Sequence, residues 1–395
     1  MRENYIPIPQ HAKKVSKGEV LLMNSMPEEA LPELLHDHEK SPQNYQTLSN
    51  IALACRSLGK YQDASNACAK ALMINPSDSA VWHNYSQILV DMGEFDAATM
   101  ASGAAYKIDP GMPQIRYAHG CNLLRDGRWA EGFPLYHSRF CGPRDAGIEF
   151  PEYQGEPLDG KRILVLPDGG YGDMFLWLRY LRSMKRQGAH ITLWCSPTEL
   201  RFLQENPWID VLQCFENDAD LPVGYDYWTS YMSLPAVCGS TPKTVPPHDN
   251  TAPHFDDIPS NRAGICWTAG ESATNRKFRS YELDEIEILR TADVEWQSLV
   301  PGKCPDWMKP LPEGDWLDTA KIIANLSLVV SVDSAICHLA GALDRPVWTL
   351  LHAGSDWKWL RDRETSVWWP TMKLWRSEYP DDFLKLPAKI ARELR

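Results

Sequence analysis

Short apolar runs separated by glycine loops and helical segments fill the part of the chain that follows residue 145. In its first half, an apolar run at 162–167 leads into PDGGYGD, a helical pattern that continues to Met184, Gly188, and a second run at 191–195. Strand, glycine loop, helix and strand in this order predict the start of a parallel α/β sheet.

The same pattern begins again after the proline-rich stretch STPKTVPPHDNTAP at about 240–253, which we interpret as a linker. The expected elements are, in order, a strand at 263–267, a helix from about Leu283, a strand at 326–332, a helix at 335–343 and a strand at 346–351. The sequence therefore predicts three domains: helical repeats at 1–145, a first Rossmann-like lobe at 146–250 and a second at 251–395. A ligand is expected between the lobes, at the carboxyl ends of the strands.

The first third of the chain carries an internal repeat of 34 residues. GKYQDA, GEFDAA and GRWAEG recur in phase, so that Gly59, Gly93 and Gly127 are equally spaced. The aromatic residues Tyr61, Phe95 and Trp129 keep the same spacing, as do Pro42, Pro76 and Pro110. This pattern predicts a stack of helical hairpins, in which glycine ends the first helix of a pair and proline follows the second.

These repeat residues resemble the tetratricopeptide (TPR) repeat, with about three clear units and a degenerate one around residues 10–41. The aromatic after each glycine is expected to pack between two helices, and alanines such as Ala64, Ala67 and Ala71 are expected to allow close helix approach. Two roles stay open for the array: a scaffold without a ligand, or a surface that holds an acceptor or a second subunit.

Composition narrows the class of protein. The formal net charge of -12 argues against extended binding to nucleic acid or to an anionic membrane surface. The ten cysteines include no CxxC pair, and no apolar stretch has the length of a signal peptide or membrane span. A cytoplasmic protein with reduced thiols is the simplest interpretation.

The loop Pro167-Asp-Gly-Gly-Tyr-Gly-Asp173 is the first candidate site. Gly169, Gly170 and Gly172 permit a tight turn that a ligand can approach closely, and the helix that follows favours negative charge or hydroxyl oxygens. The loop matches neither a P-loop nor GxGxxG. For Asp173 taken by itself, a helix N-terminal cap is the simpler interpretation.

Asp333-Ser334-Ala335 forms the second candidate, at the point where a buried strand runs into a helix. Asp333 and Ser334 are expected to cap that helix, whose N-terminus would stabilise a diphosphate, and His338 lies one turn later on the side of Ser334. The alternative is a capped helix with a packed histidine.

Two further segments could contribute. The basic loop Asn275-Arg-Lys277-Phe-Arg279-Ser280 is either a solvated loop or, at a strand end, a phosphate-binding loop. Asp356, Trp357 and Trp359 belong to a tryptophan-rich segment that is either core or the wall of a cleft against which a sugar or base stacks, with Asp356 ordering the loop.

Taken together, SVDSAICHLAGALDRPVW, the DWKW element, the GYGD loop and RWAEGFPLYHSRF resemble bacterial TPR-linked glycosyltransferases related to family 9 heptosyltransferases. They are more distantly similar to TPR-containing O-GlcNAc transferases. The resemblance extends over nearly the whole chain and is most specific at 326–376. It implies a GT-B fold of two Rossmann-like lobes after the TPR solenoid, inversion at the anomeric carbon, and no metal or other cofactor besides a nucleotide-sugar co-substrate.

The resemblance also implies roles for individual residues. Asp173 matches the position of a general base, and Lys277 and Arg279 match basic positions near the donor phosphates. Asp333, Ser334, Ala335 and His338 match the start of the donor-binding helix. Asp218 and Asp220 fit a loose DxD metal pattern, but their polar setting indicates a surface loop.

The leading hypothesis is therefore a metal-independent, inverting glycosyltransferase that uses a nucleotide-sugar donor. Its acceptor is a protein, a glycan or a modified nucleobase, which the TPR array could hold. The alternative is a TPR interaction protein whose transferase-like domain has lost catalysis.

Overall fold

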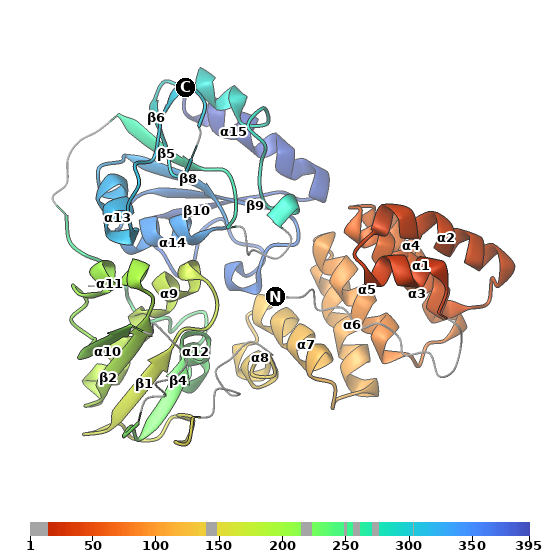
Figure 1. Cartoon of the computed structure of the whole chain (residues 1–395), viewed down its shortest axis with the longest axis horizontal. Coiled ribbons are helices and arrows are strands. Elements are labelled where there is room, and N and C mark those ends of the chain that lie inside the picture. Colours follow the sequence, from red (N-terminus) through yellow and green to blue (C-terminus); the bar gives the residue numbers. More distant parts are fainter. Residues whose placement is uncertain are drawn as a thin grey trace.

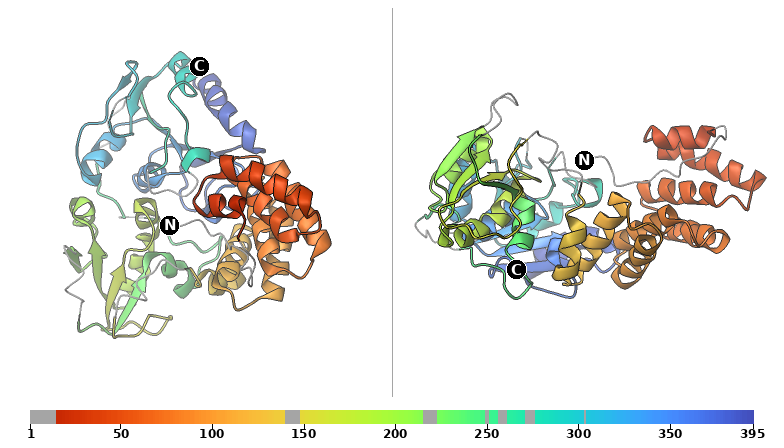
Figure 2. Two further views of the ribbon diagram at one scale, coloured as in Figure 1. Left: turned by 45° about the vertical axis from the view of Figure 1, so that its right-hand side comes forward. Right: turned by 90° about the horizontal axis from the view of Figure 1, so that it is seen from below.

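A computed structural model of the chain has three parts: a curved array of helices and two α/β lobes stacked beside it (Figure 1). The structure describes residues 15–139, 148–214, 223–248, 251–255, 261–270, 276–302 and 304–395. The order of elements confirms the predicted fold class, helical repeats followed by two parallel α/β sheets. Seen from below, the repeats extend away from the lobes, with the first helices farthest out (Figure 2).

Antiparallel helices form the repeat array, and each hairpin packs on the next. They are α1 (Lys17–Met23), α2 (Pro27–Lys40), α3 (Tyr45–Ser57), α4 (Tyr61–Ile74), α5 (Ser79–Asp91), α6 (Phe95–Ile108), α7 (Pro113–Arg125) and α8 (Trp129–Tyr136). Asn44 and Asp78 cap α3 and α5 with their side chains. Ala64, Ala67 and Ala71 are buried, as the close approach of α3 and α4 requires.

The turn glycines adopt the left-handed conformation that the repeat pattern predicts, with φ of 74° at Gly59, 81° at Gly93 and 77° at Gly127. All three also face the α/β part of the chain. A β-carbon at Gly59 would lie 3.3 Å from Phe278, one at Gly93 3.3 Å from the Glu378 carbonyl oxygen, and one at Gly127 3.6 Å from Pro242. The repeats therefore dock through their turns.

Two of the three aromatic residues after the glycines, Tyr61 and Trp129, take part in the same contact, whereas the sequence predicted packing between two helices of the array. Tyr61 contacts Phe278 edge-on, with ring centroids 5.9 Å apart, and Trp129 stacks on Trp368 at 5.3 Å. Phe95 lies under the guanidinium of Arg125.

The first lobe contains a parallel sheet of strand order β3-β2-β1-β4. Its elements are β1 (Arg162–Leu166), α9 (Tyr171–Trp177), α10 (Arg179–Arg186), β2 (His190–Cys195), α11 (Pro197–Leu203), β3 (Val211–Cys214), β4 (Tyr227–Ser230), the 3-10 helix η2 (Tyr231–Ser233) and α12 (Leu234–Val237). The single helix expected after the glycine loop is two helices that meet at Leu178. Gly188, with φ of 89°, ends the second of them.

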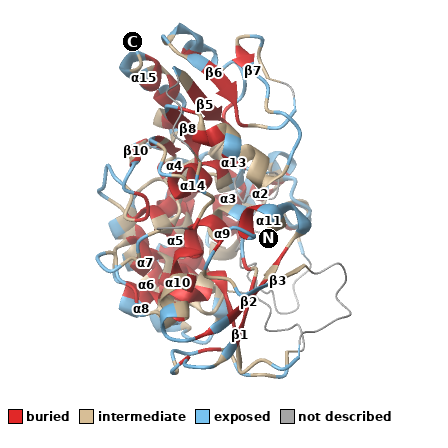
Figure 3. Cartoon of the chain, turned by 90° about the vertical axis from the view of Figure 1, so that its left-hand side faces the viewer, coloured by how far each residue is buried: buried red, intermediate tan, exposed pale blue. Residues whose placement is uncertain are grey.

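The second lobe contains a parallel sheet of order β10-β9-β8-β5-β6-β7. Its elements are β5 (Arg262–Cys266), η3 (Arg276–Phe278), η4 (Glu287–Thr291), β6 (Glu295–Ser298), β7 (Met308–Lys309), α13 (Trp316–Ala324), β8 (Leu328–Val332), α14 (Ala335–Ala342), β9 (Val347–Leu351), η5 (Trp357–Trp359), β10 (Met372–Arg376), η6 (Pro380–Lys385) and α15 (Leu386–Glu393). The strands of this sheet and α14 are largely buried (Figure 3).

The helix expected from about Leu283 is wrong: the segment forms turns and the 3-10 helix η4. Ile286 and Leu289 are buried, whereas Leu283 and Ile288 are exposed. Buried positions three residues apart suit the three-residue turn of a 3-10 helix, and they do not extend into the wider stripe of an α-helix.

The topology brings several predicted segments to one place. β9, β8 and β5 are neighbours in the second sheet, so the loops after their carboxyl ends lie side by side. These loops carry residues 352–359, Asp333 and the basic segment, respectively. The glycine loop follows β1 of the first sheet, and α9 and α14 face each other between the two sheets (Figure 1).

One buried aromatic core joins all three parts. Trp129, Phe133 and Tyr136 of α8 surround Trp357 of the second lobe, with centroid distances of 5.4 to 6.3 Å. Trp177 of the first lobe meets Trp368 at 5.0 Å. Because each ring is buried, these residues form one core that is continuous through all three parts, while further apolar clusters lie within the repeats and within each lobe.

In the described part of the chain, no helix combines the length and apolar character needed to span a bilayer.

Replacing Trp129 by Ala should destabilise the whole chain, since it empties a site that is 1% exposed where all three parts meet. We expect a loss of about 3–5 kcal/mol in the free energy of unfolding, measured by chemical denaturation. The control Tyr379→Ala, at a side chain that is 57% exposed, should change it by less than about 0.5 kcal/mol. Loss of the repeats alone, with the lobes unfolding as before, would contradict a shared core.

Candidate donor and catalytic site

Asp173 lies in the first turn of α9, at the junction of the two lobes. Its Oδ2 accepts a hydrogen bond from the backbone N–H of Gly170 at 3.0 Å, and its Oδ1 lies 3.0 Å from Nζ of Lys358. Asp173 is therefore a capping residue, as one of the two sequence-based interpretations had it, and it is also half of an interlobe ion pair that the sequence did not predict. Both side chains are largely buried, at 16% and 12% exposure.

Lys358 was not among the predicted site residues, although it lies between two that were. It belongs to η5, which Asp356 begins by accepting a hydrogen bond from the Lys358 N–H at 3.0 Å. Burial alone would lower the pKa of Lys358, but the carboxylates of Asp173, Asp356 and Asp333 outweigh it and hold that pKa well above its ordinary value. The ammonium is thus a permanent charge, placed among three carboxylates.

The glycine loop approaches the second lobe closely. Gly169 has φ of 104°, and a β-carbon there would meet the Asp173 carboxylate at 2.6 Å. Gly172 lies against the start of α14, where a β-carbon would meet His338 at 3.1 Å and Ala335 at 3.3 Å. Gly170 is the N-cap residue of α9 and has open space around it. Small residues here let the backbone of one lobe touch the helix of the other.

Asp333, at the end of β8, binds the basic segment. Nη2 of Arg279 lies 3.1 Å from its Oδ2 and also donates to the Asp333 carbonyl oxygen. Burial alone would raise the pKa of Asp333, but the charges of Arg279 and Lys358 outweigh burial and hold it well below its ordinary range. Asp333 is therefore ionised and serves as a counter-ion for two cations.

The expectation that Asp333 and Ser334 cap α14 is confirmed for the position of Ser334, but neither side chain makes a capping bond. Ser334 occupies the N-cap position in extended conformation, but its hydroxyl is hydrogen-bonded with Ser331 Oγ at 3.0 Å and makes no capping bond. Asp333 is engaged by Arg279. The amide groups of the first turn of α14 therefore have no side-chain cap, and the positive end of the helix dipole lies beside Lys358 and Arg279.

His338 is 1% exposed and stacks on Trp359, with ring centroids 5.1 Å apart. Nδ1 of His338 accepts a hydrogen bond from Nε1 of Trp369 at 3.1 Å. A neutral ring that accepts at Nδ1 carries its proton on Nε2. Within the described residues that Nε2–H has no hydrogen-bond partner, and neither has the Nε–H of Arg279. Two buried donors are thus unused at the start of α14.

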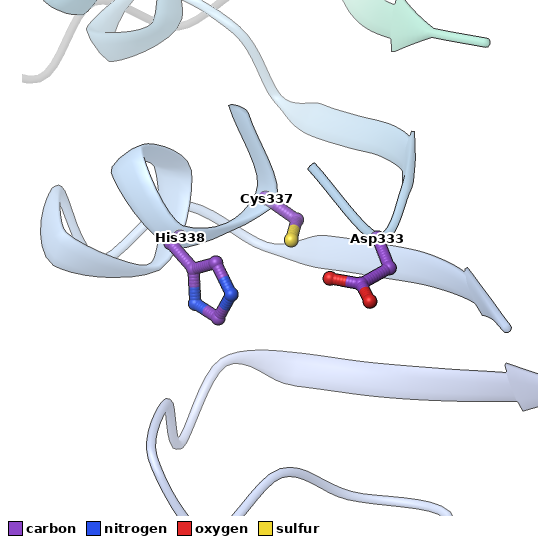
Figure 4. A group of neighbouring side chains, drawn as sticks. All are labelled: Asp333, Cys337 and His338. Carbon is purple, nitrogen blue, oxygen red and sulfur yellow. The ribbon is translucent and has the colours of Figure 1, made fainter. Parts of the chain in front are cut away.

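Asp333, Cys337 and His338 converge closely enough to resemble a metal site, with potential ligand atoms within 4.8 Å of one another (Figure 4). The chemistry of the cluster does not fit a cation. Arg279 already neutralises Asp333, and burial together with the Asp333 charge raises the pKa of the Cys337 thiol, which donates to the Ser334 carbonyl oxygen at 3.0 Å. A metal would have to displace these partners beside two fixed positive charges.

Apart from Arg279, the residues of the basic loop make no contact with Asp173, Lys358 or Asp333 among the described interactions. Lys277 is exposed and lies over the ring of Phe278 at 5.9 Å, and in the described ranges it pairs with no carboxylate, so Arg279 alone reaches Asp333. Ser280 accepts from the Ala269 N–H at 2.9 Å and holds the loop after β5. Asn275, Asp218 and Asp220 lie outside the described residues.

The cleft-wall prediction is wrong for the two tryptophans. Trp357 and Trp359 are 3% and 1% exposed, so neither ring presents an open face. Trp357 packs in the shared aromatic core, and Trp359 covers His338. Both rings are therefore part of the core, which is the alternative that the sequence analysis left open.

Because His338 is buried, its protonation should make the free energy of unfolding depend on pH. Burial and the neighbouring Lys358 lower its pKa to about 3 in the folded chain, against the nearby carboxylates of Asp333 and Asp173. An unfolded histidine titrates near ~6.5, so between these values the unfolded chain binds one more proton and stability falls as the pH drops. His338→Gln should remove up to ~1.4 kcal/mol per pH unit of this dependence between about pH 6 and 4.

Urea unfolding at stepped pH values measures the effect. The surface histidine His36, at 59% exposure, provides the matched control His36→Gln, which should keep the slope of the unsubstituted chain. His352, whose pKa burial and Arg279 lower to about 4, is present in every variant, so the comparison isolates His338. Equal slopes for the two variants would contradict a buried, neutral His338.

In a comparison with known proteins, two regions of the chain match family models. Residues 308–374 match the model of glycosyltransferase family 9 (heptosyltransferase), and residues 45–78 match a tetratricopeptide repeat. The family 9 match runs from β7 to β10 and includes Asp333, His338 and Lys358. Protein FlbA of Caulobacter vibrioides is 23% identical over 479 residues, covering 98% of this chain and 79% of FlbA.

Among solved structures, MamA is 15% identical with a TM-score of 0.30, covering 32% of this chain and 74% of MamA. The second TPR domain of human RPAP3, in complex with an HSP70 peptide, is 18% identical with a TM-score of 0.26, covering 27% of this chain and 88% of that domain. The family matches confirm the resemblance drawn from the sequence: a segment that matches the tetratricopeptide repeat precedes a segment that matches the family 9 glycosyltransferase model.

Proposed function

We propose that this chain is an inverting glycosyltransferase that transfers a sugar from a nucleoside-diphosphate donor to a hydroxyl group, without a bound metal or other cofactor. The observation that carries the proposal is the meeting of Asp173 with Lys358, beside Asp333 and Arg279, at the uncapped start of α14. The family 9 match over this part of the second lobe supports a transferase-like chemistry. The acceptor is a protein, a glycan or a modified nucleobase, and the TPR array is a candidate for holding it.

The start of α14 supplies what a diphosphate needs. Lys358 and Arg279 are charged donors, the first-turn amides of α14 have no side-chain cap, and the Nε2–H of His338 is without a partner in the described part of the chain. Oriented donors in a buried setting stabilise negative charge without reorganising during the reaction. Two cations and a helix N-terminus could therefore take the role that a divalent metal has in other transferases.

Asp173 is in place to act as the base. As the acceptor oxygen attacks the anomeric carbon from the face opposite the leaving group, its proton passes to the Asp173 carboxylate. The bond between that carbon and the phosphate oxygen breaks, and its electron pair leaves with the nucleoside diphosphate. In the structure Nζ of Lys358 lies 3.0 Å from one Asp173 oxygen and occupies it as a hydrogen-bond acceptor. A diphosphate beside Lys358 would compete for the ammonium and free that oxygen.

Two more observations bear on the surroundings of the reaction. The described cysteines are free thiols, which supports a reducing compartment such as the cytoplasm. The alternative function, a TPR interaction protein without catalysis, is favoured by the Asp173–Lys358 pair itself, because a carboxylate neutralised in this way could be purely structural.

Arg279 provides the test of donor binding. Titration calorimetry with a panel of nucleoside diphosphates should show binding to the unsubstituted chain and about 10- to 100-fold weaker binding to Arg279→Met, the loss of one charged hydrogen-bond donor. Arg279→Lys retains a cation for Asp333 but lacks the unused Nε–H, so it should bind with intermediate affinity. Arg290→Met, at a surface cation that is 67% exposed, is the control and should bind normally.

Thermal unfolding of each variant separates a binding defect from loss of the fold. If the unsubstituted chain binds none of the diphosphates or their sugar conjugates, the proposal fails. Weaker binding by Lys277→Ala, of the same size as by Arg279→Met, would restore the sequence-based role of Lys277.

Asp173→Asn separates the enzyme from the scaffold. The amide keeps an oxygen for the Gly170 N–H, but it cannot take a proton, so release of nucleoside diphosphate from a bound donor should fall about 10²- to 10⁴-fold while diphosphate affinity stays within about threefold. Chromatographic detection of the released nucleotide measures this. Donor binding without any release in either protein would favour the scaffold.

A further inference from the structure

A buried arginine from the end of the repeats holds the base of the glycine loop. Nε and Nη2 of Arg139 donate to Oδ2 of Asp168 at 2.9 and 2.7 Å, and Nη2 also donates to Ser230 Oγ at 3.0 Å and Ser233 Oγ at 2.7 Å. Asp168 follows β1 and directly precedes Gly169, and Ser230 ends β4. One guanidinium therefore ties together the carboxyl ends of two neighbouring strands, at the start of the loop that carries Asp173.

This arrangement cannot relax easily. The side chains of Arg139 and Asp168 are 9% and 2% exposed, and the guanidinium lies over the Tyr136 ring of α8 at 5.2 Å. Removing one partner of a buried ion pair leaves an uncompensated charge, so the remaining carboxylate must be protonated or must move toward water. Either response changes the backbone five residues before Asp173.

The repeats hold the opposite side of the site in the same manner. Nη2 of Arg125, in α7, donates to the Ser355 carbonyl oxygen at 3.4 Å, and the Arg125 side chain is buried. Gly354 lies so close to α5 that a β-carbon there would meet the Val90 carbonyl oxygen at 2.8 Å.

The residues after Ser355 continue this contact. Trp357 is enclosed by rings of α8, and Arg361 pairs with Asp96 at 2.5 Å and Asp126 at 3.3 Å. Lys358 thus lies within a turn whose neighbours on both sides are fixed by the repeats.

We propose that the end of the TPR array is a structural component of the transferase site, with Arg139 and Arg125 as positioning residues for the Asp173 loop and the Lys358 turn. Neither arginine is proposed to touch a substrate. The inference rests on the proposed function for its catalytic consequence, but the positioning of the two segments can be measured without turnover. It implies that the repeats cannot be removed without loss of the site, whatever else they bind.

Hydrogen exchange of the glycine loop tests the proposal directly. The N–H groups of Gly170, Asp173 and Met174 are hydrogen-bonded within the loop and the first turn of α9, so a peptide spanning 169–177 reports whether they are held. In Arg139→Met these amides should exchange at least about tenfold faster than in the unsubstituted chain. Arg139→Lys, which keeps the charge and can donate to Asp168, should restore a large part of the protection.

Arg128→Met is the matched control. Arg128 lies in the same helical region and pairs with Glu131 at 2.6 Å, but it is 49% exposed, and its loss should leave exchange in 169–177 unchanged. Exchange is compared well below each variant's unfolding temperature, and protection in the distant strand β6 shows whether Arg139→Met is folded. If Arg139→Met fails to fold, Arg139→Gln, which also lacks the charge but keeps a polar side chain, takes its place in the comparison with Arg128→Met. Loop exchange equal to that of Arg128→Met, in the variant that folds, would overturn the proposal.

Where turnover is found, the kinetic constants separate positioning from binding. Arg139→Met should lower kcat about 10- to 100-fold, because a displaced Asp173 takes the proton of the acceptor hydroxyl less readily, while the affinity for nucleoside diphosphate, set by the second lobe, stays within about threefold. A kcat equal to that of the unsubstituted enzyme would overturn the proposal. If the unsubstituted chain neither binds nor turns over any donor, the proposed function fails, and the exchange experiment still decides whether Arg139 positions the loop.

Discussion

The shared aromatic core is the constraint on which the rest of the structure depends. Trp129 comes from the repeats, Trp177 from the first lobe, and Trp357 and Trp368 from the second lobe, and all four rings are buried in mutual contact. Large aromatic rings contribute more apolar area than other side chains, so separating any one part would expose a large part of this core to water. The lobes and repeats therefore hold each other in a fixed relation, and residues far apart in sequence can be placed to within a hydrogen-bond length.

The site held by this core consists of four side chains of alternating charge. Asp173, Lys358, Asp333 and Arg279 are each largely buried, and the charged state of Lys358 and Asp333 depends on their neighbours. Isolated charges would be very costly in such a setting, whereas alternating charges compensate one another. The proposed diphosphate, placed beside the two cations, would replace carboxylate partners with phosphate oxygens, so the cations would keep negatively charged partners when it binds.

Local patterns were enough to predict most of the architecture. The 34-residue period identified the helical hairpins, because each repeat needs the same glycine conformation at the same turn. Apolar runs identified the central strands, since a parallel strand is buried on both faces. The helix expected from Leu283 failed because apolar residues alone do not show which of them are buried: Ile286 and Leu289 are buried, and Leu283 is not.

The site was predictable only in part, and the reason is distance along the chain. Asp173, Asp333 and Arg279 follow strands, so parallel topology alone brings them toward one edge. The partners that complete the site are remote: Lys358 is separated from Asp173 by 185 residues, and Arg139 from Ser230 by 91. No spacing rule relates such positions, and Lys358 stood unassigned between two residues that were assigned. Composition likewise could not distinguish tryptophans in the core from tryptophans that face a ligand, because the exposure of a ring depends on which residues cover it.

The repeat period also fixes how the array is placed on the lobes. Each turn glycine satisfies two requirements, a left-handed backbone and close approach by another segment, and the approaching segments differ. Gly59 meets the basic segment at Phe278, Gly93 meets the ends of β9 and β10, and Gly127 meets the interlobe linker at Pro242. Three equivalent turns thus contact three non-equivalent surfaces, so a shift by one hairpin would place every turn against the wrong partner. The docking register, and with it the position of Arg125 and Arg139 beside the site, is therefore set by the same glycines that shape the repeats.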